Sequence, residues 1–228
     1  MTITNSIYEV KSRIDSACER SGRDSKDVTL VAVSKTLPAD CIEQAYQVGL
    51  RIFGESRPQE VRDKTVLLPQ DIEWHFIGHL QTNKIKYVLP VCSLIHSVDS
   101  MHLAEAISDY CQTKNISANI LLEVNTSSET SKMGLQPKET GEIFKQVRML
   151  PNINLLGLMT IAPFTKIEAD IRQSFRLLSR IKEELSSEID RDQRFELSMG
   201  MSQDYEIAIE EGSTMIRVGT SIFGPRGR

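Results

Sequence analysis

The chain has 228 residues, of which 40% are hydrophobic and 25% charged, and these ordinary proportions argue against intrinsic disorder. Its formal net charge of -4 excludes a surface built as a whole to attract nucleic acid or anionic lipid. The cysteines lack the close spacing of zinc or redox motifs, and no uncharged stretch approaches the roughly 18 residues of a membrane span. We therefore expect a cytoplasmic protein with neither a nucleic-acid nor a membrane partner.

The predicted elements begin with a helix over residues 6–20, which we expect to close one end of the fold. From residue 27 onward, short β-rich runs alternate with helical patterns, as they do in repeated βα units. The helical patterns include residues 101–114, 138–150 and 168–189. Eight apolar runs end, in chain order, at Lys35, Ser56, His79, Ser100, Thr126, Pro163, Gly200 and Gly224.

Eight strands with helical crossovers fit either a closed barrel or an open doubly wound sheet, and periodicity alone does not separate the two. The count of eight favours the barrel, although 228 residues is somewhat below the roughly 250 that are typical. No linker, low-complexity tract or internal repeat interrupts the pattern. We predict an α/β fold with one domain over residues 1–228, a (β/α)8 TIM barrel with an extra N-terminal helix.

The first run ends in Lys35, and the residues that close the strands of such a barrel form its active site. Lys35 follows Val31, Ala32 and Val33, and a charge among such residues is costly to bury. Desolvation lowers the pKa of a lysine, and a partly neutral amine can attack an aldehyde to form a Schiff base. The structural alternative is a lysine that reaches solvent or pairs with Glu55.

Small residues close the last two runs, with Ser198, Met199 and Gly200 in the seventh and Gly219 and Thr220 in the eighth. Backbone N–H groups and hydroxyls bind phosphate, and barrels commonly build that site from the loops after strands seven and eight. A helix start predicted at residues 202–205 would add a favourable dipole. Such residues are also frequent in ordinary turns, so the prediction rests on the positions of the two loops.

Arg217 lies two residues before Gly219 and therefore on the same side of its strand, towards the barrel interior if Gly219 faces it. A buried arginine needs a partner, and a heterocyclic nitrogen or a carboxylate would serve. Opposite a pyridine nitrogen, the guanidinium would keep that nitrogen unprotonated and weaken the ring as an electron sink.

Three histidines, His75, His79 and His96, suggest a metal site. On one strand, His75 and His79 would lie about 13 Å apart, and no cysteine or carboxylate completes a ligand set. We predict no metal, and His79 is either a pocket residue or a hydrogen-bonded strand-end residue.

Six blocks of sequence together resemble the pyridoxal phosphate homeostasis proteins, a family of alanine-racemase-like proteins that bind pyridoxal 5'-phosphate (PLP). The resemblance covers about residues 30–224, and the combination is specific, whereas VSK or GLMT alone would say little. The blocks are VAVSK at 31–35, FGESRPQE at 53–60, WHFIGHLQTNK at 74–84, GLMTIAP at 157–163, LSMGMSQDYEIAI at 197–209 and IRVGTSIFG at 216–224.

The resemblance implies a barrel like that of alanine racemase, the fold type III of PLP proteins, with Lys35 as the Schiff-base lysine and Arg217 facing the pyridine nitrogen. Ser56 stands where the family usually has Asn, and a serine offers the ring fewer hydrogen bonds. The other residues that the resemblance assigns to the cofactor are His79 and Met159 in the pocket wall, and Ser198, Met199, Gly200, Gly219 and Thr220 around the phosphate.

The resemblance also implies a function: buffering or delivery of PLP inside the cell, with PLP-dependent apoenzymes as transient partners and a consequence for amino-acid metabolism. The alternatives are a PLP-dependent racemase or decarboxylase of fold type III, and a Schiff-base aldolase that acts on a sugar phosphate without a cofactor. Alanine racemase has a second domain that supplies a catalytic tyrosine, and this chain ends just after the eighth run. We therefore expect a non-catalytic carrier, and a monomer, since nothing in the sequence demands a second subunit.

Overall fold

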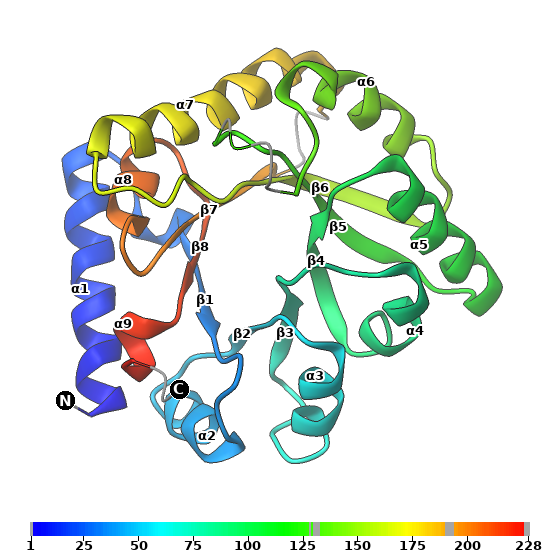
Figure 1. The fold of residues 1–228 in the computed structure, drawn as a ribbon. Helices are drawn as coiled ribbons and strands as arrows, with labels where there is room; N and C mark the ends of the chain where they lie inside the picture. Colours follow the sequence, from blue (N-terminus) through cyan, green and yellow to red (C-terminus); the bar gives the residue numbers. More distant parts are fainter. Residues whose placement is uncertain (1, 128, 130–132, 190–193, 226–228) are drawn as a thin grey trace.

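Eight parallel strands form a closed barrel in the computed structural model, which describes residues 2–127, 129, 133–189 and 194–225 (Figure 1). The first strand, β1 (Thr29–Val33), pairs with both the second and the eighth, and this pairing closes the sheet. The predicted barrel is confirmed, and the open doubly wound sheet is excluded. The other strands are β2 (Ile52–Glu55), β3 (Glu73–Phe76), β4 (Cys92–Val98), β5 (Ala118–Glu123), β6 (Ile153–Met159), β7 (Glu196–Met201) and β8 (Met215–Val218).

Helices surround the barrel, and local sequence signals set their ends (Figure 1). Ser100 caps the helix that follows β4, since its hydroxyl accepts a hydrogen bond from the N–H of Leu103, and Asn115 ends that helix in the left-handed conformation. The helices after the strands are α2 (Ala39–Gln47), α3 (Pro58–Thr65), α4 (Ile85–Val88), α5 (Met101–Lys114), α6 (Pro137–Arg148), α7 (Glu168–Glu184), α8 (Tyr205–Glu210) and α9 (Thr220–Phe223).

The predicted N-terminal helix is present as α1 (Ile3–Ser21), and it ends at Gly22 in the left-handed conformation. Its buried side includes Ile7, Val10, Ile14 and Ala17, which recur every three or four residues. However, α1 contacts α2, α8 and α9 on the outside of the barrel, so the expectation that it closes one end is wrong (Figure 1). Because α9 has only 4 residues, α1 covers the wall beside β8 and β1 that a longer helix would cover.

The barrel interior has an apolar layer with a polar layer next to it. The apolar layer is a separate cluster of Leu94, Leu121, Met159 and Met215, contributed by β4, β5, β6 and β8. Side chains two residues apart on a strand share a face. On β4, β5 and β8, the residues two positions after Leu94, Leu121 and Met215 therefore also face inward. These residues are polar, and they are His96, Glu123 and Arg217. The carboxyl ends of the strands therefore carry the ionisable groups.

Among the residues that the structure describes, no helix is both long enough and apolar enough to span a bilayer. All eight strands belong to the one barrel. The assignment of residues 1–228 to a single domain stays a prediction.

Candidate functional site

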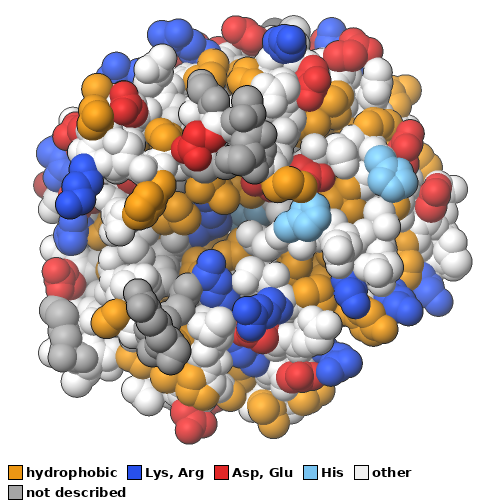
Figure 2. Space-filling view, in the orientation of Figure 1, with side chains coloured by type: hydrophobic (Ala, Val, Ile, Leu, Met, Phe, Trp, Pro, Cys, Tyr) orange, Lys and Arg blue, Asp and Glu red, His pale blue; other side chains and the backbone are white. Residues whose placement is uncertain are grey.

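The predicted site residues gather where the strands end. Lys35 follows β1, Ser56 follows β2 and His79 follows β3, while Arg217 and Gly219 lie at the end of β8. On the face that Figure 2 shows, lysine or arginine side chains lie inside and beside a central hollow. The predicted residues at the strand ends thus lie at one end of the barrel, where basic side chains surround the hollow.

Lys35 is partly buried just beyond β1. Val31 is the register partner of Arg217, whose side chain lies inside the barrel. Because side chains alternate along a strand, Val31, Val33 and Lys35 share this interior side. The carboxylate of Glu55, the partner considered from the sequence, accepts hydrogen bonds from Ser34 Oγ at 2.7 Å and from Lys64 Nζ at 2.7 Å. Lys35 thus stands at the rim of the interior, next to a buried ionic cluster.

The loops after β7 and β8 meet, as predicted for a phosphate site. The backbone N–H groups of Gly219 and Ser221 both donate to Ser202 Oγ, at 3.1 Å and 3.3 Å. Backbone N–H donors that converge on one oxygen are an arrangement suited to an anion, and here the oxygen they hold is that of the Ser202 hydroxyl. Gly200 allows β7 to approach α8 closely at this point. Its φ is +95°, which favours glycine, and a Cβ there would lie 2.6 Å from the Cβ of Ala208 in α8.

The predicted helix start at residues 202–205 is also present, since α8 begins at Tyr205 after Asp204. The Asp204 carboxylate accepts a hydrogen bond from the N–H of Met201, which ties the loop to the helix. The contribution of its dipole to anion binding stays a prediction, since α8 has only 6 residues and no side chain caps its first turn. The hydrogen-bond donors of the two loops remain the feature that fits an anion.

Arg217 is the buried cation of the interior. Its guanidinium donates to Ser198 Oγ at 2.6 Å and to the carbonyl oxygen of Thr160 at 2.9 Å, so β6 and β7 fix its position. Burial lowers its pKa to about 10, while the carboxylates of Glu123 and Asp204 act in the opposite direction. The group stays protonated at neutral pH and points at the interior as a desolvated donor.

A hydrogen-bonded chain leads from Arg217 deeper into the barrel. Ser198 Oγ lies 2.8 Å from His96 Nδ1, and His96 Nε2 lies 3.0 Å from His75 Nδ1. Burial lowers the pKa of His75 to about 4 and that of His96 well below its ordinary value, so both rings are neutral at pH 7. Each neutral ring has one N–H. The Ser198 hydroxyl can therefore donate to His96 Nδ1 and the His96 Nε2–H to His75 Nδ1, so that both contacts are hydrogen bonds. Among the described residues, no group of three or more His, Cys, Asp or Glu side chains is arranged to hold a metal ion.

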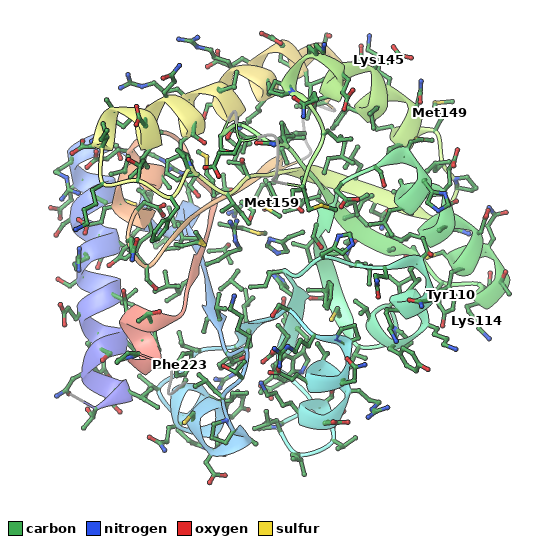
Figure 3. The ribbon with its side chains drawn as sticks, in the orientation of Figure 1. Tyr110, Lys114, Lys145, Met149, Met159 and Phe223 are labelled. Atoms are coloured by element: carbon green, nitrogen blue, oxygen red, sulfur yellow. The ribbon has the colours of Figure 1, made fainter. Side chains whose placement is uncertain are left out.

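The side chains of Ser198 and Met199, which the resemblance places around the phosphate, do not point at the barrel mouth. The hydroxyl of Ser198 is fully buried and bonded within the Arg217 chain, whereas the resemblance implied a phosphate contact. Met199 lies on the opposite face of β7, in the core between strands and helices, so only its backbone can face the mouth. Met159 is the register partner of Ser198, and its side chain faces the barrel interior (Figure 3).

The structure adds an acidic group that sequence reasoning missed. Glu123 ends β5 in the interior, and burial raises its pKa to about 7, with Asp99 acting in the same direction and Arg217 and His79 against it. His79 is half-exposed, and its Nδ1 lies 3.2 Å from Asp99 Oδ2. The spacing Leu121 to Glu123 could have indicated this residue, because a charged side chain two positions after a buried leucine shares its face.

The fold and the site together define a class: a (β/α)8 barrel with a lysine after its first strand, two loops after its last two strands where backbone N–H groups converge on one oxygen, and a buried arginine on β8 that donates to Ser198 and Thr160. The family model "Alanine racemase, N-terminal domain" matches residues 9–227. A pyridoxal phosphate homeostasis protein of Aquifex aeolicus is 43% identical over 227 residues, which cover 99% of each chain. The corresponding protein of Escherichia coli is 37% identical over 230 residues, covering 98% of this chain and 97% of the relative. This chain belongs to the pyridoxal phosphate homeostasis protein family, as the six blocks indicated.

Solved structures agree with this assignment. An unknown protein from Bifidobacterium adolescentis has a TM-score of 0.93 at 42% identity, covering 97% of this chain and 94% of the other. PipY of Synechococcus elongatus with PLP bound has a TM-score of 0.81 at 36% identity, covering 94% of this chain and all of PipY (100%). Alanine racemase of Clostridium difficile, at a TM-score of 0.73 and 12% identity, shares the fold over 96% of this chain and 60% of its own length.

Proposed function

We propose that this protein binds PLP as a Schiff base on Lys35 and serves intracellular PLP homeostasis, by buffering or delivery and with an effect on amino-acid metabolism. The observation that carries the proposal is the convergence of the Gly219 and Ser221 N–H groups on one oxygen, at the same barrel mouth as Lys35. The relatives named as homeostasis proteins and the PLP-bound structure of PipY support the choice of ligand.

The donors present fit the groups of PLP. The loops after β7 and β8 would hold the phosphate through backbone N–H groups, including that of Gly219, and through Thr220, which is exposed at the start of α9. Arg217 would face the pyridine nitrogen as a donor that stays protonated. When bound, PLP would supply an electrophilic aldehyde, and the Lys35 amine would hold it covalently, with the aldehyde oxygen lost as water.

The remaining assigned residues would form the walls of the pocket. Ser56 and His79 lie in the loops after β2 and β3, and these loops touch, since a Cβ on Gly78 would lie 2.3 Å from the carbonyl oxygen of Ser56. Met159 forms part of the apolar layer below. Because the hydroxyl of Ser198 is bonded to Arg217 and His96, we assign Ser198 the task of positioning the guanidinium.

We further propose a carrier, and no racemase, decarboxylase or aldolase. Racemisation requires a second base on the far face of the substrate carbon. Tyr205, the tyrosine of the matched blocks, is buried outside the barrel, with its ring centroid 5.6 Å from the Arg13 guanidinium of α1. The proposal includes a cytoplasmic monomer that contacts PLP-dependent apoenzymes transiently.

Absorption spectroscopy tests the proposal. Addition of PLP to the purified protein should produce a visible Schiff-base band that Lys35→Ala abolishes, and incubation with a panel of amino acids should give no racemised or decarboxylated product. The protein as purified should already carry this band if it binds PLP, whereas a sugar-phosphate aldolase as purified would carry none. Turnover of any amino acid would show that the protein is an enzyme and contradict the carrier role.

A further inference from the structure

We infer that a buried ionic cluster of Glu55, Glu60 and Lys64 positions the backbone on both sides of Lys35; this inference rests on the proposed Schiff base. The cluster, called the Lys64 cluster below, joins β2 to α3 and lies directly behind the segment that follows β1. Its members are positioning residues, because they act on the reactive amine through the neighbours of Lys35.

The residue before Lys35 is held by two of the cluster's members. Ser34 Oγ donates to Glu55 Oε1 at 2.7 Å, and the carbonyl oxygen of Ser34 accepts from Lys64 Nζ at 2.9 Å. Ser34 and Glu55 have no exposed surface. Water therefore cannot replace these contacts, and Ser34 is fixed by both its side chain and its backbone.

The residue after Lys35 is held by the third member. The N–H of Thr36 donates to Glu60 Oε2 at 2.6 Å, and the same carboxylate oxygen lies 3.0 Å from Lys64 Nζ. Thr36 has a φ of +66°, a left-handed conformation that β-branched residues rarely adopt. A conformation of this kind persists where surrounding contacts enforce it. Here the Glu60 carboxylate acts together with the local turn, in which the Leu37 N–H donates to the Ser34 carbonyl oxygen and the Thr36 hydroxyl donates to the Lys35 carbonyl oxygen.

One cation thus ties the two anchors together. Lys64 Nζ contacts Glu55 Oε1 at 2.7 Å as well as Glu60, although its side chain is only 9% exposed. Burial raises the pKa of Glu55, and the hydrogen bonds from Lys64 and Ser34 oppose that rise. Partial burial also acts to raise the pKa of Glu60, but the Thr36 N–H and Lys64 outweigh it and lower the pKa.

A buried ionic cluster is a poor source of net stability compared with apolar packing, because desolvation offsets much of the attraction between the charges. What it provides is fixed geometry at one location. That location is the turn from which the reactive lysine projects, so the geometry it fixes is that of the Lys35 amine relative to the aldehyde.

Glu60 gives the sharpest test, since its side chain is 19% exposed and its replacement leaves no large cavity. Glu60→Ala removes the acceptor for Thr36, whereas Glu60→Gln keeps an oxygen at that position and removes the charge. Glu73, exposed at the start of β3 at the opposite end of the barrel, provides the matched control Glu73→Ala.

Two probes separate the amine from the rest of the site: PLP, and pyridoxine 5'-phosphate, which carries the same phosphate and ring but no aldehyde. Glu60→Ala should weaken PLP binding and slow the appearance of the absorption band by roughly tenfold, the cost of one hydrogen bond to a charged group. Its affinity for pyridoxine 5'-phosphate should stay within about twofold of that of the wild type, and Glu60→Gln should recover most of the PLP affinity. Glu73→Ala should match the wild type with both probes.

Equal losses for both probes in Glu60→Ala would overturn the inference, because they would indicate general damage to the pocket. No loss with either probe would overturn it as well. If the wild type itself forms no band with PLP while it binds pyridoxine 5'-phosphate, the proposed Schiff base fails first and the positioning role fails with it.

Discussion

Replacing His75 by Gln should change how the stability of the barrel depends on pH, because the folded protein keeps this histidine neutral. Burial lowers the pKa of His75 from 6.5 to about 4, and its Nδ1 is bonded to His96. Between pH 6.5 and about 4 the unfolded chain binds a proton at this position and the folded chain does not. The contribution of His75 to stability is therefore present above the unfolded pKa and is lost as the pH falls towards the folded one.

The size of this effect follows from the two pKa values. The interval from 6.5 to about 4 covers about 2.5 pH units at ~1.4 kcal/mol each, which gives about 3.5 kcal/mol in all and about 3 kcal/mol by pH 4, where the folded histidine begins to bind a proton. Glu55 and Glu123, whose pKa values are raised, contribute with the opposite sign. Both carboxylates are present in the wild type and in the variant, so their contributions largely cancel in the difference between the two proteins. That difference reports on His75 together with its effect on the pKa of His96, which His75 helps to lower.

Urea unfolding at intervals from pH 4 to pH 8 measures that difference. Between pH 7 and pH 4, the free energy of unfolding of the wild type should fall by about 3 kcal/mol more than that of His75→Gln. His102→Gln, which replaces an exposed histidine on α5, should show a pH profile parallel to that of the wild type. A constant difference between the wild type and His75→Gln would refute the assignment of a buried, neutral histidine.

Three further predictions concern the ionisable groups and the ligand. Arg217→Met should weaken PLP binding at least tenfold in a titration, and unchanged affinity would remove Arg217 from the site. The same variant should lower the free energy of unfolding in urea by about 2–4 kcal/mol, because Ser198 Oγ and the Thr160 carbonyl lose their donor. Pyridoxal, which lacks the phosphate, should bind at least about 100-fold more weakly than PLP in the same titration, since it forgoes the charge-assisted hydrogen bonds of the β7 and β8 loops; equal affinities would contradict the phosphate site. Glu123→Gln should stabilise the protein more at pH 8 than at pH 5, by up to about 3 kcal/mol, because a carboxyl whose pKa is raised to about 7 destabilises the fold once it ionises; equal effects at the two pH values would contradict its burial.

The sequence predicted the barrel well, because each strand of a parallel sheet is a separate apolar run and the runs could be counted. The structure resolved the choice between barrel and open sheet through the pairing of β1 with β8, a contact between strands at the two ends of the series. The place of α1 was not predictable in the same way. Its apolar face showed that the helix packs, but not that a short α9 leaves the barrel wall beside β8 for it to cover.

The positions of the candidate site residues were predictable in part. Residues at the ends of strands could be located from the sequence, whereas contacts inside the barrel could not. Lys35 and Gly219 follow from their positions at the ends of strands. The contact of His96 with His75 depends on the relative positions of β3 and β4, and the buried position of Lys64 depends on the phase of α3. Neither is visible in a single strand or helix pattern, although Glu60 and Lys64, four residues apart, have the spacing of a helical ion pair.

Borohydride reduction followed by peptide mass analysis tests the central claim most directly. Reduction of the protein with PLP should leave the cofactor attached to the peptide that contains Lys35, and the same treatment of Lys35→Ala should leave no attached cofactor. Attachment at Lys64, Lys84 or another lysine of the wild type, or attachment that persists in Lys35→Ala, would contradict the assignment of Lys35 as the cofactor-binding amine.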